Sequence, residues 1–469
     1  MTLVDCISEE FSGVSLGDER LDRRLRQLAS AAATAPAASF PVMAQGDAAL
    51  EATYRFFGNE RVEAEEILRP HIRQTSKRAA MVSQIVVAHD TTEFNFGKSS
   101  RKDLGRVGQG KSFGFYAHVA LVVSATEQRE PLGVIGQSVH QRTGGKGKRG
   151  HKALQSSGDN ESRRWHVLVN DVEDRIGELR PIHVMDREAD SYALMANLVA
   201  EKRRFVIRMA SDKRRLDTGE RVCDQLLSAA LRAKREVPIS SRRSSSMPSY
   251  RKHFPPRIAR PAQLEIRAER VTIKRPASAN KSRAKTISLN VVHVIEPQPP
   301  EGEPAVEWRL WTSESVELEE DVLAIVDAYR SRWRIEEYFK ALKSGCAMEK
   351  RQLETHEGLV RTLALFTPIA WRLLLLRTIA HRDDNSPGSS VLTKQLLVCL
   401  RFALEKSGNK PLPESPTACE TMWALARLGG HLKRNGPPGW ITLGRGLDKL
   451  LNVELGYLLA VESGHFEEK

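Results

Sequence analysis

YRSRWRIEEYFKALK, residues 329–343, predicts an α-helix with an unusual polar face. At about 100° per residue, four of its side chains fall within an arc of roughly 60°. One carboxylate beside two cations and a phenol suggests a carboxylate that binds a metal ion next to phosphate groups. Taken alone, the carboxylate could equally form an exposed salt bridge with a cation four residues away. The face consists of Tyr329, Arg332, Glu336 and Lys343.

Two aspartates could complete such a site. The apolar runs QIVVAHD and PIHVMD predict strands that end at Asp90 and Asp186. Carboxylates at the ends of neighbouring strands can meet at one edge of an α/β sheet. With Glu336 they would form an all-oxygen site, which suits Mg²⁺ or Mn²⁺ and not zinc. Each aspartate alone is more often a turn former or helix cap, so the hypothesis depends on all three carboxylates together.

The order of the predicted elements indicates a mixed α/β core between two helical regions. Three antiparallel strands should be followed by helix, strand, helix and strand, before a basic, β-rich insertion at about 212–302. The first helix should begin at Ser15 as its N-cap. We expect a helical N-terminal domain, the core with its insertion, and a helical C-terminal domain, at residues 1–78, 79–375 and 376–469 respectively.

Composition narrows the class of protein. The 469 residues carry a formal net charge of +13, which favours nucleic acid or another anionic surface as partner. The five cysteines are scattered without a CxxC pair, which argues against a zinc site or disulfide framework and favours a reducing cytoplasm. No secretory signal is recognisable, and the most apolar run, 363–376, is interrupted by Pro368 and Arg372. We therefore expect no membrane partner.

The acidic segments resemble those of the bacterial DDE cut-and-paste transposases, and within them the insertion-sequence-four group, to which the transposon Tn-five (IS-fifty) transposase belongs. HDTTEFNF, MDREAD and the helix at 329–343 carry the likeness, and the group's Tyr-x-x-Arg-x-x-x-Glu-x-x-x-x-x-x-Lys signature is complete. LGDERLDRR and ATYRFFGN are similar to the group's end-binding domain. LARLGG and a tryptophan-containing tail are similar to its dimerisation region.

This resemblance implies an RNase H-like core in which Asp90, Asp186 and Glu336 are the catalytic metal ligands. The cofactor would be Mg²⁺, with Mn²⁺ as a substitute, in a two-metal site. Trp308 would stack beside a flipped base, although it could be an ordinary core tryptophan, and Trp311 is an alternative. The other implied DNA-binding residues are Tyr329, Arg332, Lys343, Arg208 and Arg55.

The resemblance also implies a function. A homodimer would bind double-stranded DNA with terminal inverted repeats, nick it, form and reopen hairpins, and join the 3′ ends to target DNA. It would act in the bacterial cytoplasm, at the nucleoid. A catalytically silent regulator or inhibitor derived from a transposase is an alternative, and a structure-selective nuclease is another. Because TGGKGKRGHK, residues 143–152, and the basic stretch at about 240–260 differ from the group, recognition of the end sequence does not carry over.

The C-terminal segment contains an apolar stripe that fits two interpretations. A helix with leucines on one face could form a dimer contact or could pack within its own chain. The stripe consists of Leu443, Leu447, Leu450, Leu451, Leu455 and Leu458.

Overall fold

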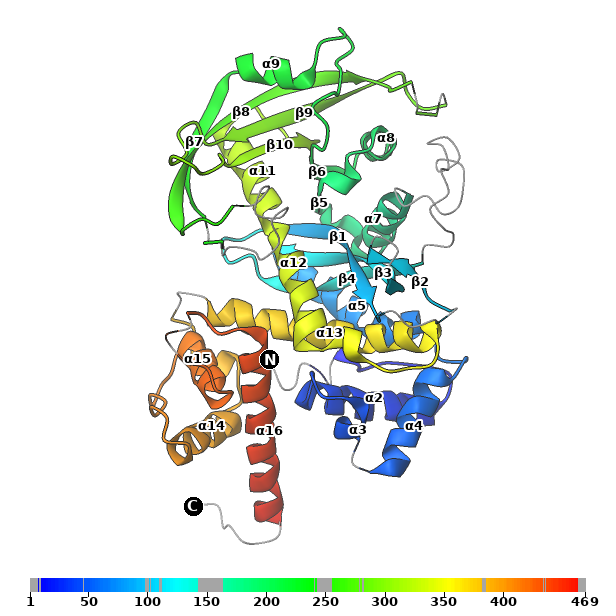
Figure 1. Ribbon diagram of the computed structural model, residues 1–469, viewed down its shortest axis with the longest axis vertical. Helices are drawn as coiled ribbons and strands as arrows, with labels where there is room; N and C mark the ends of the chain where they lie inside the picture. Colours follow the sequence, from blue (N-terminus) through cyan, green and yellow to red (C-terminus); the bar gives the residue numbers. More distant parts are fainter. Residues whose placement is uncertain are drawn as a thin grey trace.

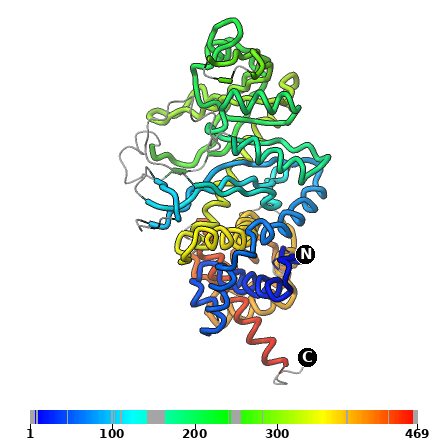
Figure 2. The backbone as a smooth tube through the Cα atoms, turned by 90° about the vertical axis from the view of Figure 1, so that its right-hand side faces the viewer, coloured from blue at the N-terminus to red at the C-terminus, as the bar shows by residue number. Residues whose placement is uncertain are grey.

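A computed structural model of the chain has three parts (Figure 1). The insertion lies at one end, a mixed sheet with its helices occupies the middle, and two groups of helices lie at the other end. The N-terminal and C-terminal helices lie side by side below helix α13 (Figures 1 and 2). The structure describes residues 7, 10–44, 46–97, 101, 103–108, 112–141, 163–239, 241–242, 255–277, 279–280, 282–381, 385–432, 434 and 436–462. The loop at 143–152 and most of the basic stretch at 240–260 lie outside the described residues.

The mixed α/β core contains the expected strand order. Strand β1 pairs antiparallel with β3, and β3 pairs antiparallel with β4, which confirms the three antiparallel strands. Strands β1, β5 and β6 are parallel neighbours, and β10 is antiparallel to β6. A short strand, β2, also pairs with β3 and was not expected. The bounds are β1 Ile85–Asn95, β2 Gly105–Val107, β3 Ser112–Ser124, β4 Pro131–His140, β5 Ile182–Met185, β6 Arg204–Arg208 and β10 Glu307–Thr312.

The insertion extends the core sheet instead of forming a separate one. Its strands β9, β8 and β7 follow β10 in a single ten-stranded sheet. The two long alternating segments were expected as strands, whereas β7 and a short helix, α9, were not. All three antiparallel pairs of this half are regular apart from one shift at Leu231 and Ala233. The bounds are α9 Val222–Ser228, β7 Leu231–Ile239, β8 Arg260–Lys274 and β9 Thr286–Ile295.

Helices cover the two faces of the sheet. Helices α7, Arg163–Ile176, and α8, Tyr192–Ala200, cover one face, where Trp165 and Met195 pack with Phe205. Helices α11, Glu319–Ser331, and α12, Trp333–Lys340, lie on the opposite face and run from the insertion towards α13 (Figure 1). On that face Val86 of β1 and Val184 of β5 pack in one cluster with Val322 of α11. Alternate residues of β1 and β5 therefore face α11 and α12.

The N-terminal region is helical, as expected. Its first described long helix begins one turn later than predicted, because Asp18 and not Ser15 is the N-cap and accepts a hydrogen bond from the Arg20 N–H at 2.9 Å. An aspartate caps as well as a serine, and its carboxylate also favours the positive end of the helix dipole. The bounds are α2 Glu19–Thr34, α3 Phe40–Met43, α4 Asp47–Gly58 and α5 Ala64–Ala80.

A buried polar cluster joins the N-terminal segment to the core. His71 of α5 donates its Nδ1–H to the Glu10 carboxylate and accepts the Val134 N–H from β4 at Nε2, at 3.0 Å. Arg78 pairs with the same carboxylate, and its guanidinium lies 4.1 Å from the ring centre of Trp371 in α13. Burial lowers the pKa of His71, in agreement with a neutral ring in this tautomer. Removing any member would leave a buried polar group unpaired, so the cluster fixes how these elements dock.

The C-terminal helices pack on the core through α13 and share one continuous hydrophobic cluster with it. Helix α13 is long and apolar enough to cross a membrane by length and composition, but 89% of its apolar window is buried inside the protein, as in the core helix of a soluble protein. Leu443, Leu447 and Leu450 of α16 are buried within the chain, whereas Leu455 and Leu458 are exposed. The stripe thus divides between intramolecular packing and an uncovered end. The bounds are α13 His356–Ala380, α14 Lys394–Lys406, α15 Ala418–Leu428 and α16 Trp440–Glu462.

Helices α15 and α16 approach each other through glycines. A Cβ on Gly429 would lie 1.9 Å from the Thr442 carbonyl oxygen, and one on Gly446 would lie 1.9 Å from the Leu425 oxygen. The LARLGG segment, expected at a dimer contact, therefore packs tightly against its own chain at this point.

Candidate active site

The helix predicted over 329–343 consists of three pieces. Helix α11 ends at Ser331, Arg332 keeps right-handed helical angles between the helices, and α12 continues from Trp333. The last turn is a π-helix, η4, at Ala341–Gly345. A π-turn adds a residue to the helical turn and shifts the side chains that follow. Lys343 therefore leaves the face that straight helical spacing predicts for it.

Asp90 and Asp186 lie level with each other on neighbouring strands. The parallel register pairs Ala88 of β1 with Val184 of β5, and the two aspartates stand two residues further along. Both therefore belong to the face that α11 and α12 cover. The prediction that Asp90 ends its strand is wrong. Asp90 lies in the middle of β1, opposite Val119, because the pairing with β3 continues to Asn95. Asp186 directly follows β5 and caps η3, Arg187–Ala189, by accepting the Glu188 N–H at 2.9 Å.

Arg332 links the sheet to the helix. Its Nη1 donates to Asp90 Oδ2 at 3.0 Å, and its Nη2 donates to Glu336 Oε1 at 2.5 Å. The Arg332 and Asp90 side chains are 13% and 15% exposed, so solvent screens this pair only weakly. Both carboxylates thus meet at one guanidinium, and the expected exposed salt bridge between residues 332 and 336 is half-buried.

The site carries more negative charge than this one arginine balances. Burial, followed by repulsion from Asp186 and Glu336, raises the pKa of Asp90 to about 7, against the opposing effects of Arg332 and the Thr91 N–H. Burial would lower the pKa of Arg332, but Tyr329, Asp90 and Glu336 together raise it above its ordinary value. The ion pair and the raised aspartate pKa are compatible because desolvation and carboxylate repulsion outweigh a single cation. Asp186 and Glu336 are therefore close enough to Asp90 to influence its ionisation.

Asp90, Asp186 and Glu336 offer only oxygen donors to a divalent cation. Within the described part of the chain, no three His, Cys, Asp or Glu side chains converge closely enough to share one ion. The guanidinium of Arg332 lies between Asp90 and Glu336 instead. Three carboxylates of excess negative charge, with oxygen donors alone, nevertheless match the chemistry of Mg²⁺ or Mn²⁺. The donor atoms suit the ion by type, whereas Arg332 occupies the space between two of them in this structure.

An aromatic and cationic group lies beside the carboxylates. Trp308 of β10 and Tyr329 of α11 have ring centres 5.6 Å apart at an interplanar angle of 58°. Arg208 of β6 reaches the Tyr329 hydroxyl at 3.5 Å and the Glu307 carbonyl at 3.3 Å. Trp308 is half-buried, whereas the alternative, Trp311, is fully buried on the other face of the sheet. Trp308 is thus the more accessible of the two tryptophans.

The two remaining predicted residues lie apart from this centre. Lys343 lies 5.6 Å from the Phe94 ring, towards the end of β1, and its Nζ is 3.9 Å from Glu349 Oε1. Arg55 projects from α4 in the N-terminal helices, is 71% exposed, and lies 3.6 Å from Glu51. The structure therefore groups the three carboxylates with Arg332, Tyr329, Trp308 and Arg208, and leaves Lys343 at the margin and Arg55 in another part of the molecule.

A buried histidine network under the site was not anticipated. Glu173 of α7 accepts the Nε2–H of His183 at 3.0 Å, and His183 accepts the Nε2–H of His89 at Nδ1, at 2.8 Å. Arg203 donates to the other Glu173 oxygen at 2.9 Å. Burial lowers the pKa values of both histidines, which supports neutral rings in these roles. The network connects β1 and β5 one residue before Asp90, on the face opposite the carboxylates. Only the presence of histidine in two otherwise apolar strands could have signalled it.

Comparison with known proteins identifies two regions. A family model described as transposase DNA-binding matches residues 5–62, and one described as transposase DDE domain matches residues 83–367, more than half of the chain. Among solved structures, the chain is similar to one in the cryo-EM structure of the piggyBac transposase synaptic complex with hairpin DNA. That match has 12% identity and a TM-score of 0.30, and it covers 79% of this chain and 57% of the other. At this score the two structures share too little for a detailed comparison.

Proposed function

The chain belongs to the DDE transposase family, and from this premise we propose that it is a cut-and-paste DNA transposase of the insertion-sequence-four group. Membership gives it a DNA-binding region, an RNase H-like core and the general class of a DNA-cleaving and strand-transferring enzyme. The proposed reaction begins with nicking at a terminal inverted repeat, which releases a 3′-hydroxyl. That hydroxyl attacks the opposite strand to form a hairpin, a water reopens the hairpin, and the freed 3′ end attacks a target phosphodiester.

One observation carries this proposal. Asp90 and Asp186 lie level on two parallel strands, and Arg332 on the packed helix joins Asp90 to Glu336, while both other carboxylates contribute to the raised pKa of Asp90. A fold that only needed stability would gain little from this arrangement, because buried like charges destabilise it. Clustered, largely buried carboxylates, one of them with a raised pKa, are typical of a functional site.

The residues around the carboxylates are suited to holding DNA. Arg332 can bind a phosphate through two parallel hydrogen bonds, whereas Lys343 acts as a point charge further along β1. The half-buried Trp308 offers a ring against which an unstacked base can pack, and the buried Tyr329 supports it from below, with Arg208 at the Tyr329 hydroxyl. An arriving phosphate would compete with Asp90 for Arg332, which would separate the guanidinium from the carboxylates.

Divalent cations, with Mg²⁺ as the physiological ion and Mn²⁺ as a substitute, would be held by Asp90, Asp186 and Glu336 in a two-metal site. When bound, they would increase the acidity of the attacking water or 3′-hydroxyl and stabilise the leaving oxygen. The carboxylates' own part is to bring oxygen ligands together on rigid strands and a helix.

The three parts of the chain divide the remaining work. Residues 1–78 bind the transposon end, with Arg55 exposed on α4, and residues 79–375 form the catalytic core with its insertion at about 212–302. Residues 376–469 contribute to a homodimer, for which the uncovered end of α16 is suited because Leu455, Tyr457, Leu458 and Leu459 are all exposed. The protein would act in the bacterial cytoplasm, at the nucleoid.

The test is cleavage of DNA that carries the ends flanking the gene in its host, with Mg²⁺, resolved on a denaturing gel. Glu336→Gln should lower nicking at least about 10³-fold, because a carboxylate ligand worth several kcal/mol is lost. Binding of the same DNA should stay within about threefold, since the change leaves the rest of the DNA-binding surface intact. Glu320→Gln, at the exposed start of α11, is the matched control and should cleave normally. Continued Mg²⁺-dependent nicking by Glu336→Gln would contradict the assignment.

The same gel separates the alternatives. A catalytically silent regulator would bind the ends with the wild-type chain yet yield neither nicks nor hairpins with Mg²⁺ or Mn²⁺. A stand-alone nuclease would nick but would not join a 3′ end to a second duplex.

A further inference from the structure

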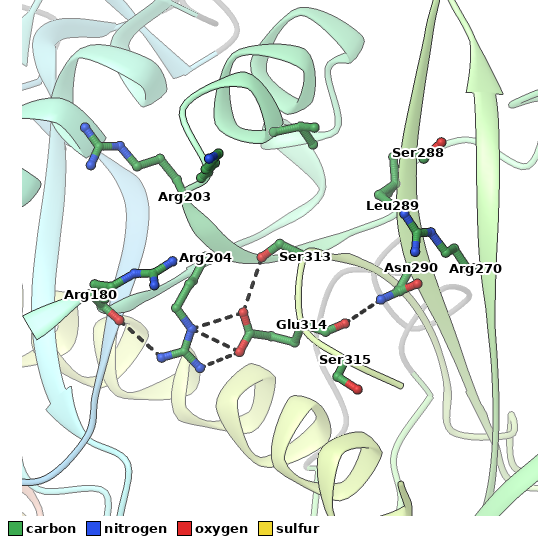
Figure 3. A pocket seen from close by; sticks show the side chains of 12 residues that line it. Arg180, Arg203, Arg204, Arg270, Ser288, Leu289, Asn290, Ser313, Glu314 and Ser315 are labelled. Atoms are coloured by element: carbon green, nitrogen blue, oxygen red, sulfur yellow. Dashed lines mark hydrogen bonds and ion pairs between the residues drawn. The ribbon is translucent and has the colours of Figure 1, made fainter. Parts of the chain in front are cut away.

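A basic pocket lies at the edge of the sheet opposite the carboxylates. Its volume is about 560 Å³, and it is lined by residues that precede β5, by the start of β6, by β8 and β9, and by the segment after β10. Figure 3 shows Arg180 and Arg203 on one side, Arg270 and Asn290 on the other, and Ser313 to Ser315 between them. The parallel strands β5 and β6 begin at this edge and end at the other, which holds Asp186.

Two of the pocket's arginines serve the fold. Arg204 forms an ion pair with Glu314 and also donates to the Arg180 carbonyl at 3.2 Å. Arg203 pairs with Glu173, the carboxylate at the start of the histidine network, at 2.9 Å. Both side chains are held by carboxylates, so they build the wall of the pocket and have little charge left for a ligand.

Three other cations have no such partner. Arg180, Lys202 and Arg270 are exposed, and none forms an ion pair with a carboxylate among the residues that the structure describes. They come from three separate elements and converge on one cavity. Asn290, opposite Arg270 on the neighbouring strand, has its amide nitrogen bound to the Glu314 carbonyl at 2.6 Å, which fixes the floor between them. The pocket therefore presents three cations that form no ion pair within the described residues, of which Arg180 is also attracted by Glu173.

The backbone places two of these cations at a conformational cost. Arg180 and Lys202 have φ values of 43° and 54°, in the left-handed region, and each ends a helix where glycine is the usual residue. At Lys202 the chain forms the hydrogen bonds of a helix-terminating motif, since the Arg203 N–H reaches the Leu198 carbonyl at 2.8 Å. A bulky side chain in this region costs about 1 kcal/mol relative to glycine. Placing a long cation at both positions indicates that the side chains are used.

The composition of the pocket indicates what it binds. Its charge suits phosphate, and no aromatic side chain is among the residues that line it, so it offers no surface on which a base could stack. A site that contacts phosphates without stacking on bases suits the DNA backbone. Asp186 and Arg180 are six residues apart, or roughly 20 Å at about 3.3 Å per residue of strand. A phosphate at the carboxylates cannot reach this pocket.

We propose that the pocket formed by Arg180, Lys202 and Arg270 binds the phosphodiester backbone of a DNA segment separate from the one held at the carboxylates. The contact is independent of base sequence and of metal ions. It rests on the DNA-binding role proposed for the chain and not on its cleavage chemistry. A second stretch of duplex, such as target or flanking DNA, is the ligand with this chemistry in the proposed reaction.

The test is a titration of the full chain with a fluorescent duplex of about 30 base pairs that lacks the element's ends. EDTA is present, so cleavage plays no part, and the salt concentration is varied from roughly 50 to 300 mM. The variant Arg180→Gln/Lys202→Gln/Arg270→Gln keeps the side-chain stems and removes the charges. Losing three phosphate contacts should reduce the slope of log K against log salt by about 2.7, and should weaken binding roughly tenfold or more.

The matched control is Lys394→Gln/Lys406→Gln/Lys410→Gln, which removes the same charge from exposed positions near α14. An equal loss of binding in the control would show an effect of net charge alone and would overturn the proposal. Circular dichroism of each variant during heating shows that it is folded. Inorganic pyrophosphate is the second probe. If it raises the melting temperature of the wild type but not of the pocket variant, while their duplex titrations coincide, the pocket binds a small anion and not DNA.

These outcomes are independent of the cleavage test. A chain that fails to nick its ends but shows the expected change in salt slope would contradict the proposed function and leave the pocket assignment standing. Unchanged duplex binding in a chain that nicks normally would overturn the pocket assignment alone.

Discussion

The two edges of the central sheet differ in the sign of their charge. Where β5 ends, Asp186 lies level with Asp90, which shares Arg332 with Glu336, and the pKa of Asp90 is raised to about 7. Where β5 begins, exposed cations outnumber carboxylates in the pocket that contains Arg180. Phosphate is repelled by the first edge unless further cations are present, and it is attracted by the second without them. In the two proposals, one set of strands serves metal-dependent chemistry at one end and metal-independent binding at the other, about 20 Å apart.

The strongest way to break this comparison is Asp90→Asn. It should reduce Mg²⁺-dependent nicking at least about 10³-fold, because a proposed metal ligand is lost, while duplex binding in EDTA changes little. A gel assay and the anisotropy titration measure the two effects. Asp174→Asn, on the exposed side of α7, should leave both unchanged. A fall in metal-free duplex affinity as large as the fall in nicking would mean that the edges are not separate.

The second prediction concerns how the stability of the fold depends on pH through Asp90. The pKa of Asp90 is about 7 in the folded chain and 3.8 in the unfolded chain, so between these values only the folded chain holds the proton. The stability of the fold is therefore highest below about pH 4 and falls as the pH rises to about 7. In EDTA, the free energy of unfolding of the wild type should fall relative to Asp90→Asn by about 2–4 kcal/mol between about pH 4 and 8. Urea denaturation measures it, and taking the difference cancels the buried histidines. A pH-independent difference would show that the pKa of Asp90 is not raised in the folded chain.

The third prediction concerns the strand that the two edges share. His183 lies inside β5, fully buried, between Glu173 and His89. His183→Ala should lower the free energy of unfolding by about 2–4 kcal/mol, since it opens a cavity and leaves two buried polar groups without this partner. His166→Ala, whose partner Glu201 is partly exposed, should cost less than about 1 kcal/mol. Equal urea midpoints for the two variants would contradict a structural role for the network.

The smallest expected effect is at Lys202. Lys202→Gly should change the free energy of unfolding by less than about 0.5 kcal/mol, because relief of the left-handed backbone offsets the flexibility that glycine adds to the unfolded chain. Lys77→Gly, near the end of α5, should cost about 1 kcal/mol. Thermal unfolding compares the two. If Lys202→Gly lowered the free energy of unfolding as much as Lys77→Gly, backbone strain at Lys202 would no longer support the pocket proposal.

Regular apolar patterns made much of the fold predictable. The runs that became β1, β3 and β4, and the alternating β8 and β9, show clear periodicity, because buried strand positions must be apolar. Strand β7 was missed because six of its nine residues, LRAKREVPI, are charged, proline or small, and only Ala233 and Val237 are buried. The mid-strand place of Asp90 was also missed, since polar residues after an apolar run look like a turn when their pairing partner is unknown.

The two sites differ in how far sequence could reveal them. The proximity of the carboxylates could be predicted because each stands in or directly after a recognisable apolar run or in a periodic helix. The π-turn that displaces Lys343 depends on tertiary packing, which helical spacing cannot anticipate. The pocket was not predicted because Arg180, Lys202 and Arg270 share no spacing and are brought together only by the order of strands in the sheet.

The buried cluster of Glu10, His71 and Arg78 has a geometric consequence. Because His71 is hydrogen-bonded to β4 and Arg78 packs on Trp371, the N-terminal helices cannot pivot about α5 without stripping partners from polar groups inside the protein. If those helices bind a transposon end, the rigid docking of the helices on the core sets the number of base pairs between the bound sequence and the cleavage site. Inserting half a helical turn of DNA between the bound sequence and the cleavage site should therefore prevent cleavage, whereas a flexible connection between the helices and the core would tolerate the insertion.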